Sequence, residues 1–243
     1  MPVKLSGRNL FAEPDQGAEF RLTAQDTVFG EGLCIHDQKA VLPYYLAEGS
    51  ISSAVAEILL AGGDAPTYGI ASLFGEDEGI AEDLHRCLKE VAKSKKILLD
   101  FTRTAVKAVS TGFTLSLFSR VEQSELRYRK AREGHWIYLV RVLESLEGIG
   151  TENRLRDEFI RDLARNTGVA EACLLKGSTI QECLWSMLRG TGCFYVETQP
   201  GRIYQQQIAK GKGLIFFSPY RVSRISDEDV ELIELGTILN KDA

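Results

Sequence analysis

Four acidic side chains stand in segments that are otherwise expected to be structured and apolar. Asp26 follows a predicted strand, and Asp37 lies between two short predicted strands. Glu57 interrupts an apolar helical segment, and Asp100 lies within or at the end of the strand "ILLDFT". A carboxylate that is buried without a partner costs several kcal/mol. Four converging carboxylates would instead suit Mg²⁺, which takes oxygen ligands and usually arrives with a nucleotide phosphate.

Each of these residues also has a simpler explanation. Glu57 is compatible with the exposed side of a helix, and Asp100 with the end of a strand. His36 and Asp37 are compatible with a tight turn, in which an aspartate is common. The hypothesis of a metal site therefore depends on the joint pattern of the four carboxylates and not on any one of them.

Other catalytic signatures are absent from the sequence. It contains no P-loop, no G-x-S-x-G elbow and no H-E-x-x-H motif. With 3 histidines in the chain, a Ser-His-Asp site has few ways to form, and His85 is expected at the surface of a helix. Cys173, Cys183 and Cys193 recur at regular spacing, but no C-x-x-C pair or nearby histidine pair supports a zinc site. No residue is assigned a catalytic role.

The composition is that of a folded protein without a strong charge bias. The 243 residues are 44% hydrophobic and 26% charged, with a formal net charge of −5, and they suffice for one large domain or two small ones. The acidic balance argues against nucleic acid or an anionic membrane as the main partner. No segment approaches the roughly 18 apolar residues of a membrane span, and no signal-peptide core is apparent. We therefore expect a cytoplasmic protein with reduced cysteines.

The first half of the chain predicts strands mixed with helices. Strands are expected at residues 19–24, 67–74, 96–106 and 112–123, and two short ones around His36 and Asp37. A helix is expected from Ser50 or Ser52 to a stop at Gly62 and Gly63. The clearest helix spans residues 77–96, with an apolar stripe at helical spacing. This order predicts an α+β fold with a mixed or antiparallel sheet.

A second domain is expected after Gly148 to Gly150, which divides the chain into residues 1–147 and 148–243. Helices are predicted at residues 151–168 and 177–192, strands at 193–199 and 213–222, and a short helix, or a helix plus a strand, at 226–239. Thr179 and Glu182 have the spacing of a capping box.

Three stretches resemble the aminoimidazole ribonucleotide synthetase-like (PurM-like) ATP-binding superfamily. "HDQKAVLPYYLAEG" is similar to its "TDxxVVxP" motif, "AEILLAGGDAP" to its "SDIxAMGGxP" helix end, and "LRYRKAREGHWIYLV" to "LRxGAxPGDxIYVTG". Between them, "ILLDFTRT" stands where the family has "GGDT". The resemblance covers roughly residues 25–148. It is nearest to the branches of thiamine-monophosphate kinase and the hydrogenase maturation carbamoyl dehydratase.

The resemblance implies an ATP- and Mg²⁺-dependent enzyme that phosphorylates a small molecule or activates an amide or carbonyl oxygen, as a kinase or a ligase. It implies an N-terminal ATP-binding sheet with helices on one face, which forms a barrel with a second copy on dimerisation, and a smaller α/β C-terminal domain. The implied metal ligands are Asp26, Asp37, Glu57 and Asp100, and the implied nucleotide-binding residues are Gly62, Gly63, Asp100 and Thr102. The implied partners are a nucleotide, a small-molecule substrate and a second copy of the chain.

Departures from the family motifs leave two interpretations open. Glu57 replaces the family's aspartate, Leu98 and Leu99 replace the glycines of "GGDT", and the aspartate of "PGDxI" becomes His135. The C-terminal part is short for the family and matches its motifs poorly. The chain is therefore either an active enzyme of this superfamily or a relative that has lost catalysis and acts as a dimeric binding or scaffold protein. A wrong family assignment is the third alternative.

Overall fold

The structure is a computed structural model of the 243-residue chain. It describes residues 13–14, 19–29, 42–75, 77–103, 111–122, 125–127, 130–142, 159–160, 162–163, 168–175, 179–208, 213–225 and 230–240. The chain divides into two compact units, which we describe separately. The N-terminal unit comprises Arg8–Ile58 and Gly63–Glu125, and the C-terminal unit comprises Met1–Gly7, Leu59–Gly62 and Leu126–Ala243. The predicted boundary at residues 147 and 148 lies outside the described residues.

Within the described residues, the N-terminal unit contains a mixed sheet of five strands. Their spatial order is β1 (Glu13–Pro14), β2 (Glu19–Phe29), β5 (Gly112–Glu122), β3 (Tyr68–Phe74) and β4 (Leu98–Arg103). β3 and β4 are parallel, and the other neighbours are antiparallel. The predicted mixed α+β character is thus confirmed. The barrel formed on dimerisation stays a prediction.

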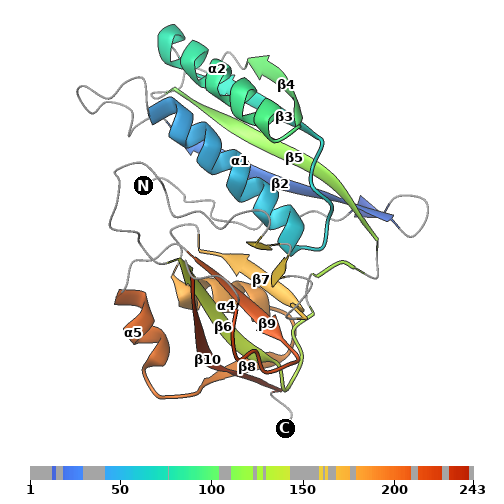
Figure 1. Ribbon diagram of the computed structural model, residues 1–243, viewed down its shortest axis with the longest axis vertical. Coiled ribbons are helices and arrows are strands. Elements are labelled where there is room, and N and C mark those ends of the chain that lie inside the picture. The colour runs from blue at the N-terminus through green and yellow to red at the C-terminus, as the bar shows by residue number, and fades with distance from the viewer. Residues whose placement is uncertain are drawn as a thin grey trace. The chain divides into compact units, whose positions relative to one another are not determined.

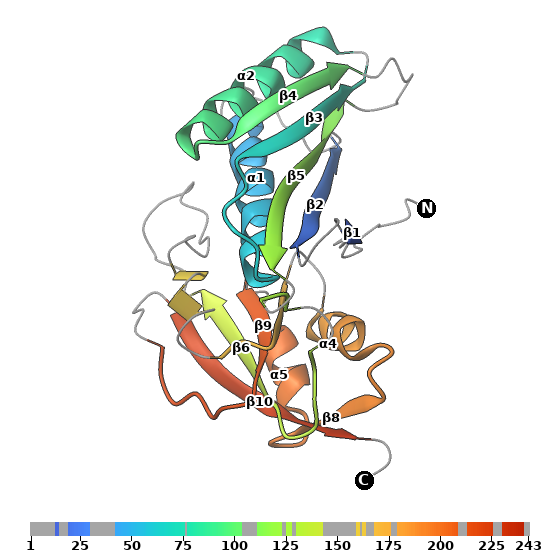
Figure 2. The ribbon, with the colours of Figure 1, turned by 90° about the vertical axis from the view of Figure 1, so that its right-hand side faces the viewer.

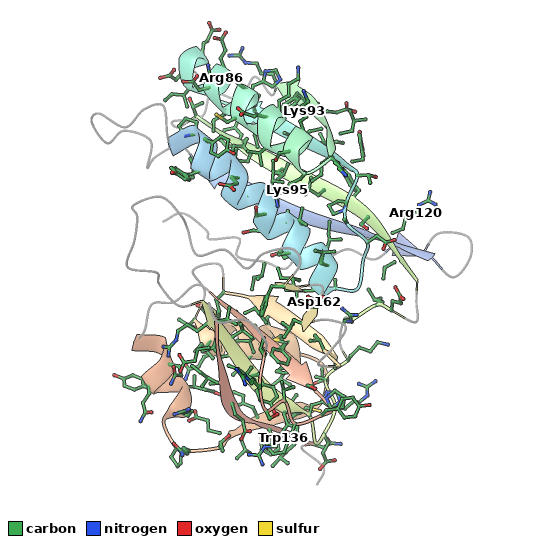
Figure 3. The ribbon with its side chains drawn as sticks, viewed as in Figure 1. Arg86, Lys93, Lys95, Arg120, Trp136 and Asp162 are labelled. Atoms are coloured by element: carbon green, nitrogen blue, oxygen red, sulfur yellow. The ribbon has the colours of Figure 1, made fainter. Side chains whose placement is uncertain are left out.

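Helices α1 (Leu42–Leu60) and α2 (Glu78–Ser94) cover one face of this sheet (Figures 1 and 2). α2 begins where the sequence predicts, because Oδ1 of Asp77 accepts a hydrogen bond from the backbone N–H of Ile80 at 3.0 Å. Its buried stripe includes Leu84, Leu88 and Val91, which pack towards the sheet. The outer side carries charged side chains such as Arg86 and Lys93 (Figure 3).

α1 begins earlier than its sequence predicts. The helix starts at Leu42, so the second short strand predicted before Ser50 is wrong at Leu42–Tyr45. Pro43 is tolerated in the first turn of a helix, where its missing N–H is not needed. The helix is also buried on most of its sides, so its sequence lacks the narrow apolar stripe that would mark its start.

The described part of the C-terminal unit contains a second sheet of five strands, all antiparallel. Their spatial order is β7 (Glu171–Leu174), β9 (Gly213–Ser218), β6 (Trp136–Val142), β10 (Val230–Asn240) and β8 (Cys193–Glu197). α4 (Ile180–Leu188) and α5 (Arg202–Ile208) also belong to this unit. Because the described strands run antiparallel, this unit is α+β, which corrects the α/β class predicted for it.

One cluster of buried side chains joins α4 to one face of the second sheet. It includes Leu184 and Met187 of α4, Ile137 of β6 and Phe217 of β9, each at most 1% exposed. α4 begins at the predicted capping box: Thr179 Oγ1 accepts from the backbone N–H of Glu182 at 3.1 Å, and the backbone N–H of Thr179 donates to the Glu182 carboxylate at 2.8 Å. The burial of this helix face fixes α4 on the sheet.

Two elements of the C-terminal unit differ from the sequence-based prediction. Residues 230–240 form strand β10, so a single helix at 226–239 is wrong, whereas the strand in the alternative of a helix plus a strand is present. A register shift between Glu234 and Gly236 breaks the alternation of buried residues that normally indicates a strand. Helix α5 was not predicted, because its seven residues are mostly polar and lack a clear stripe. The helix predicted at 151–168 is helical at residues 159–160 and 162–163, and its remainder lies largely outside the described residues.

In the described part of the chain, no helix is long and apolar enough to cross a membrane.

Replacement of Thr179 by alanine removes the side-chain acceptor of the capping box. We expect Thr179→Ala to lower the free energy of unfolding of the C-terminal unit by about 1 kcal/mol. Urea unfolding followed by tryptophan fluorescence measures this, since both tryptophans, Trp136 and Trp185, belong to this unit. Ser186→Ala, at an exposed position of the same helix, should change stability by no more than about 0.5 kcal/mol. Equal effects of the two substitutions would show that the capping box is not formed.

Candidate functional site

The path of the chain from β3 through α2 to β4 sets the direction of the β4 side chains. Parallel strands need a crossover connection, which α2 provides. The rings of Phe101 and His85, on α2, lie 4.2 Å apart between centroids. Arg103 Nη2 also points to α2, 3.6 Å from Glu78 Oε1. Side chains alternate along a strand, so three β4 residues point to the opposite face: Leu98, Asp100 and Thr102. We call this face, opposite α1 and α2, the open face.

Strand register arranges the open face in three rows across β5, β3 and β4. The first row is Phe118, Tyr68 and Leu98, the second is Ser116, Ile70 and Asp100, and the third is Thr114, Ser72 and Thr102. The first row is apolar and aromatic, and Leu98 is 67% exposed. The second carries one carboxylate, and the third carries three hydroxyls; we call it the hydroxyl row. The open face therefore changes from apolar at its first row to polar at the hydroxyl row.

Hydrogen bonds between β3 and β4 position the polar groups. Tyr68 donates its phenolic hydrogen to Oδ2 of Asp100 at 2.9 Å. This hydrogen bond, followed by burial and by the negative charge of Asp100, raises the pKa of Tyr68 above its usual range. Two residues beyond Asp100 on β4, the hydroxyl oxygen of Thr102 lies 2.5 Å from that of Ser72 on β3. The result is a carboxylate and a hydroxyl pair side by side at the sheet edge.

Gly62 and Gly63 end α1 in the way that the sequence predicts. Gly62 has a φ of 98°, which strongly favours glycine. The backbone N–H of Gly63 donates to Ile58 at 2.9 Å, and that of Gly62 donates to Leu59 at 3.1 Å. These two bonds form a Schellman motif, which satisfies free carbonyl groups at the end of the helix. This role in ending the helix explains why two glycines stand at residues 62 and 63. Their predicted role in nucleotide binding stays a prediction.

The structure does not bring the predicted metal ligands together within its described part. Glu57 is partly buried on α1, which covers one face of the sheet, whereas Asp100 points from the open face. Asp26 lies on β2, with its backbone paired to Leu115, and its side chain is outside the description. Asp37 also lies outside the described residues. Among the described side chains, no group of three or more possible metal ligands occurs. The four-carboxylate site stays a prediction.

The described histidines do not form a second candidate site. His85 is exposed on α2, as predicted, and packs edge-on against Phe101. His135 precedes β6, and its Nδ1 is buried without a hydrogen-bond partner. Burial, followed by the nearby charge of Arg132, lowers the pKa of His135. A neutral imidazole in the C-terminal unit is therefore expected, and nothing described around it defines a substrate site.

Sequence reasoning found Asp100 and Thr102 but missed Tyr68 and Ser72. The signal was present in the strand "TYGIASLF", in which Tyr68 and Ser72 lie on one side together with Ile70 and Phe74, and Gly69, Ala71 and Leu73 lie on the other. Alternation alone identifies the two faces of a strand. It does not identify the strand that lies beside it, so the contact with β4 was not predictable.

Comparison with solved structures identifies the fold. No family model and no curated protein sequence matches the chain. Thiamine monophosphate kinase from Aquifex aeolicus matches with a TM-score of 0.63 at 13% identity, over 96% of this chain and 89% of that one. The Stenotrophomonas maltophilia enzyme matches with a TM-score of 0.61 at 12% identity, over 93% and 84% of the chains.

A larger enzyme shares the fold. Phosphoribosylformylglycinamidine synthase II (PurL) from Thermotoga maritima matches with a TM-score of 0.67 at 12% identity. The match covers 96% of this chain and 42% of that one. The chain thus has the fold of the PurM-like superfamily, and the resemblance predicted from the sequence motifs is confirmed at the level of the fold.

The contact between Tyr68 and Asp100 has a pH-dependent signature. The Asp100 carboxylate stabilises the protonated phenol, so Asp100→Asn should lower the pKa of Tyr68 towards its ordinary value. NMR titration of ¹³Cζ-labelled tyrosine, with Tyr68→Phe to assign the resonance, measures this shift. Glu82→Gln, an exposed change on α2, is the matched control and should leave the pKa unchanged. An identical Tyr68 titration in Asp100→Asn would contradict the described contact.

Proposed function

We propose that this protein is an ATP- and Mg²⁺-dependent enzyme that phosphorylates a small molecule or activates an amide or carbonyl oxygen. The observation that carries the proposal is the shared fold combined with an oxygen-rich group, Asp100 with Ser72 and Thr102, on the open face. Proteins of this fold include a thiamine monophosphate kinase solved with AMPPCP and TMP. They also include T. maritima PurL, solved with AMPPCP, ATP or FGAR.

The side chains described on β4 fit a magnesium nucleotide. Mg²⁺ prefers hard oxygen ligands, and it commonly uses only one or two carboxylates because phosphates and waters complete its shell. Asp100 is exposed and offers such a carboxylate. Thr102 and Ser72 offer hydroxyls that can donate to phosphate oxygens. In this proposal Asp26 and Asp37 supply further ligands, and Gly62 and Gly63 allow a close approach of backbone to nucleotide. Glu57 lies on the helix-covered side of the sheet, opposite Asp100, so it would not share one metal ion with Asp100.

Phosphoryl transfer suits a site of this composition. It needs little covalent chemistry from the protein and depends on positioning and charge neutralisation. A bound Mg²⁺ would supply the charge neutralisation at the phosphates. The chain's own contribution is to hold oxygen ligands on two hydrogen-bonded strands, where the sheet fixes their spacing. Asp100 positions the metal, and the hydroxyl row orients phosphate oxygens.

Two observations favour the second candidate, a binding or scaffold protein that has lost catalysis. Oδ2 of Asp100 already accepts a hydrogen bond from Tyr68, which competes with a metal for that oxygen. Leu98 and Leu99 also stand where the superfamily motif has glycines, so their side chains occupy space near Asp100 that a glycine would leave free. In this alternative the fold persists without nucleotide binding.

We further propose that the open face contacts a second copy of the chain through its first row. Leu98 is 67% and Tyr68 is 36% exposed, and the ring of Tyr68 lies 5.9 Å from that of Phe118 in a stacked arrangement. An exposed apolar and aromatic row on a sheet is suited to burial against another protein surface. The superfamily resemblance favours a homodimer as the occupant.

Thermal unfolding with and without millimolar ATP, each with Mg²⁺ or EDTA, tests the enzyme proposal. A ligand at about 100 times its dissociation constant stabilises by roughly 2.7 kcal/mol, which raises the midpoint by about 5 °C or more. We expect a shift that needs both ATP and Mg²⁺. Asp100→Asn should abolish it, and Asp83→Asn on α2 should retain it.

The variant set also separates the two candidates. A shift that persists in Asp100→Asn would show that nucleotide binds elsewhere. No shift with any nucleotide would favour the scaffold.

Sedimentation equilibrium tests the dimer proposal separately. Leu98→Asp should place a charge in the first row and weaken self-association by at least about tenfold, because an uncompensated buried charge costs more than 1.4 kcal/mol. Glu90→Lys, an exposed change on α2, should leave it unchanged. A monomeric parent chain, or a dimer unaffected by Leu98→Asp, would refute the assignment of this face.

A further inference from the structure

Two cysteines of the C-terminal unit meet at one backbone oxygen. Sγ of Cys173, on β7, lies 3.7 Å from the carbonyl oxygen of Leu174. Sγ of Cys183, on α4, lies 3.8 Å from the same oxygen. The two sulfurs are therefore at most 7.5 Å apart, although they come from a strand and a helix.

The two cysteines differ in their exposure to solvent. Cys183 is 3% exposed and belongs to the core cluster between α4 and the second sheet. Cys173 packs against the same cluster but remains partly exposed. A small oxidant in solution therefore reaches Cys173 more readily than Cys183. The two thiols therefore lie near each other, but an oxidant reaches only one of them easily.

Strand β7 gives the pair room to close. It has only four residues and lies at the edge of its sheet, where β9 is its described neighbour. A disulfide needs its sulfurs about 2.05 Å apart, so one thiol must move towards the other. A short edge strand is held by hydrogen bonds on one side, and this allows a small displacement at low cost.

The other described cysteines lie elsewhere. Cys87 is buried on α2 of the N-terminal unit. Cys193 is on β8, at the opposite edge of the C-terminal sheet from β7 (Figure 1). Four strand spacings separate these edges, or about 19 Å. Neither residue can substitute for a member of the pair without a large rearrangement.

We propose that Cys173 and Cys183 form a redox-active dithiol that oxidises to an intramolecular disulfide between β7 and α4. With hydrogen peroxide as the oxidant, the Cys173 thiolate attacks one peroxide oxygen, which breaks the O–O bond and gives a sulfenic acid and hydroxide. The Cys183 thiol then attacks the sulfenic sulfur, the S–O bond breaks, and water leaves. Overall, two thiols and one peroxide give one disulfide and two waters. Each thiol loses one electron, and the peroxide gains two.

The sequence allows a direct test by peptide mapping. Trypsin cleavage places Cys173 in peptide 166–176, Cys183 in 177–189 and Cys193 in 190–202. The folded chain would be exposed to mild peroxide, alkylated and digested without reductant. We expect peptides 166–176 and 177–189 to appear linked, about 2 Da lighter than their sum, and to separate on reduction.

Variants and a denatured control make the test specific. Cys173→Ala and Cys183→Ala should each abolish the linked species, and Cys193→Ala should retain it. Oxidation in urea should give mixed pairings, because the folded contact is lost. The wild-type map does not depend on whether the core variant Cys183→Ala folds.

Three results would overturn the proposal. One is separate alkylation of both cysteines after peroxide, and another is linkage to Cys87 or Cys193 at equal yield. The third is an equal yield of the same link in urea, which would assign it to proximity in sequence alone.

Discussion

The parallel pairing of β3 with β4 decides which side of the N-terminal sheet carries the polar groups. Because the two strands run the same way, the chain must cross back over one face, and α2 does so. That face then needs apolar side chains, which Ala71, Leu73 and the stripe of α2 supply. Strand alternation leaves Asp100 and Thr102 on the other face. The candidate site is thus a direct consequence of the crossover.

The same constraint explains the rows of the open face. Paired residues on neighbouring strands point to the same side, so Tyr68 meets Leu98 and Ser72 meets Thr102. A carboxylate held at 2.9 Å by a phenol, beside a hydroxyl pair, is a compact set of oxygen ligands. Such a set binds a metal only when phosphates or further carboxylates complete the shell. The role proposed here for β4 therefore depends on a nucleotide; a thiamine monophosphate kinase and T. maritima PurL, which share this fold, were each solved with AMPPCP.

Local signals predicted much of the fold. The apolar spacing of α2 and the Thr179–Glu182 capping box are properties of short segments, and the structure confirms them. α1 was placed too late because burial on most sides removes the periodic stripe. For β10, the sequence left a helix and a helix plus a strand open, because a bulge interrupts alternation. For the site, the motif resemblance identified Asp100 and Thr102. Tyr68 and Ser72 required the register between two strands, which lie about thirty residues apart in sequence.

NMR titration of the ¹⁵N-labelled protein with the magnesium complex of AMPPCP tests the proposed nucleotide site directly. We expect the backbone amide shifts to change first on β3 and β4, around Tyr68–Ser72 and Leu98–Arg103, and EDTA to reverse them. Changes confined to the C-terminal unit would place nucleotide binding elsewhere. No change at millimolar ligand would show that this fold, in this chain, has ceased to bind nucleotide.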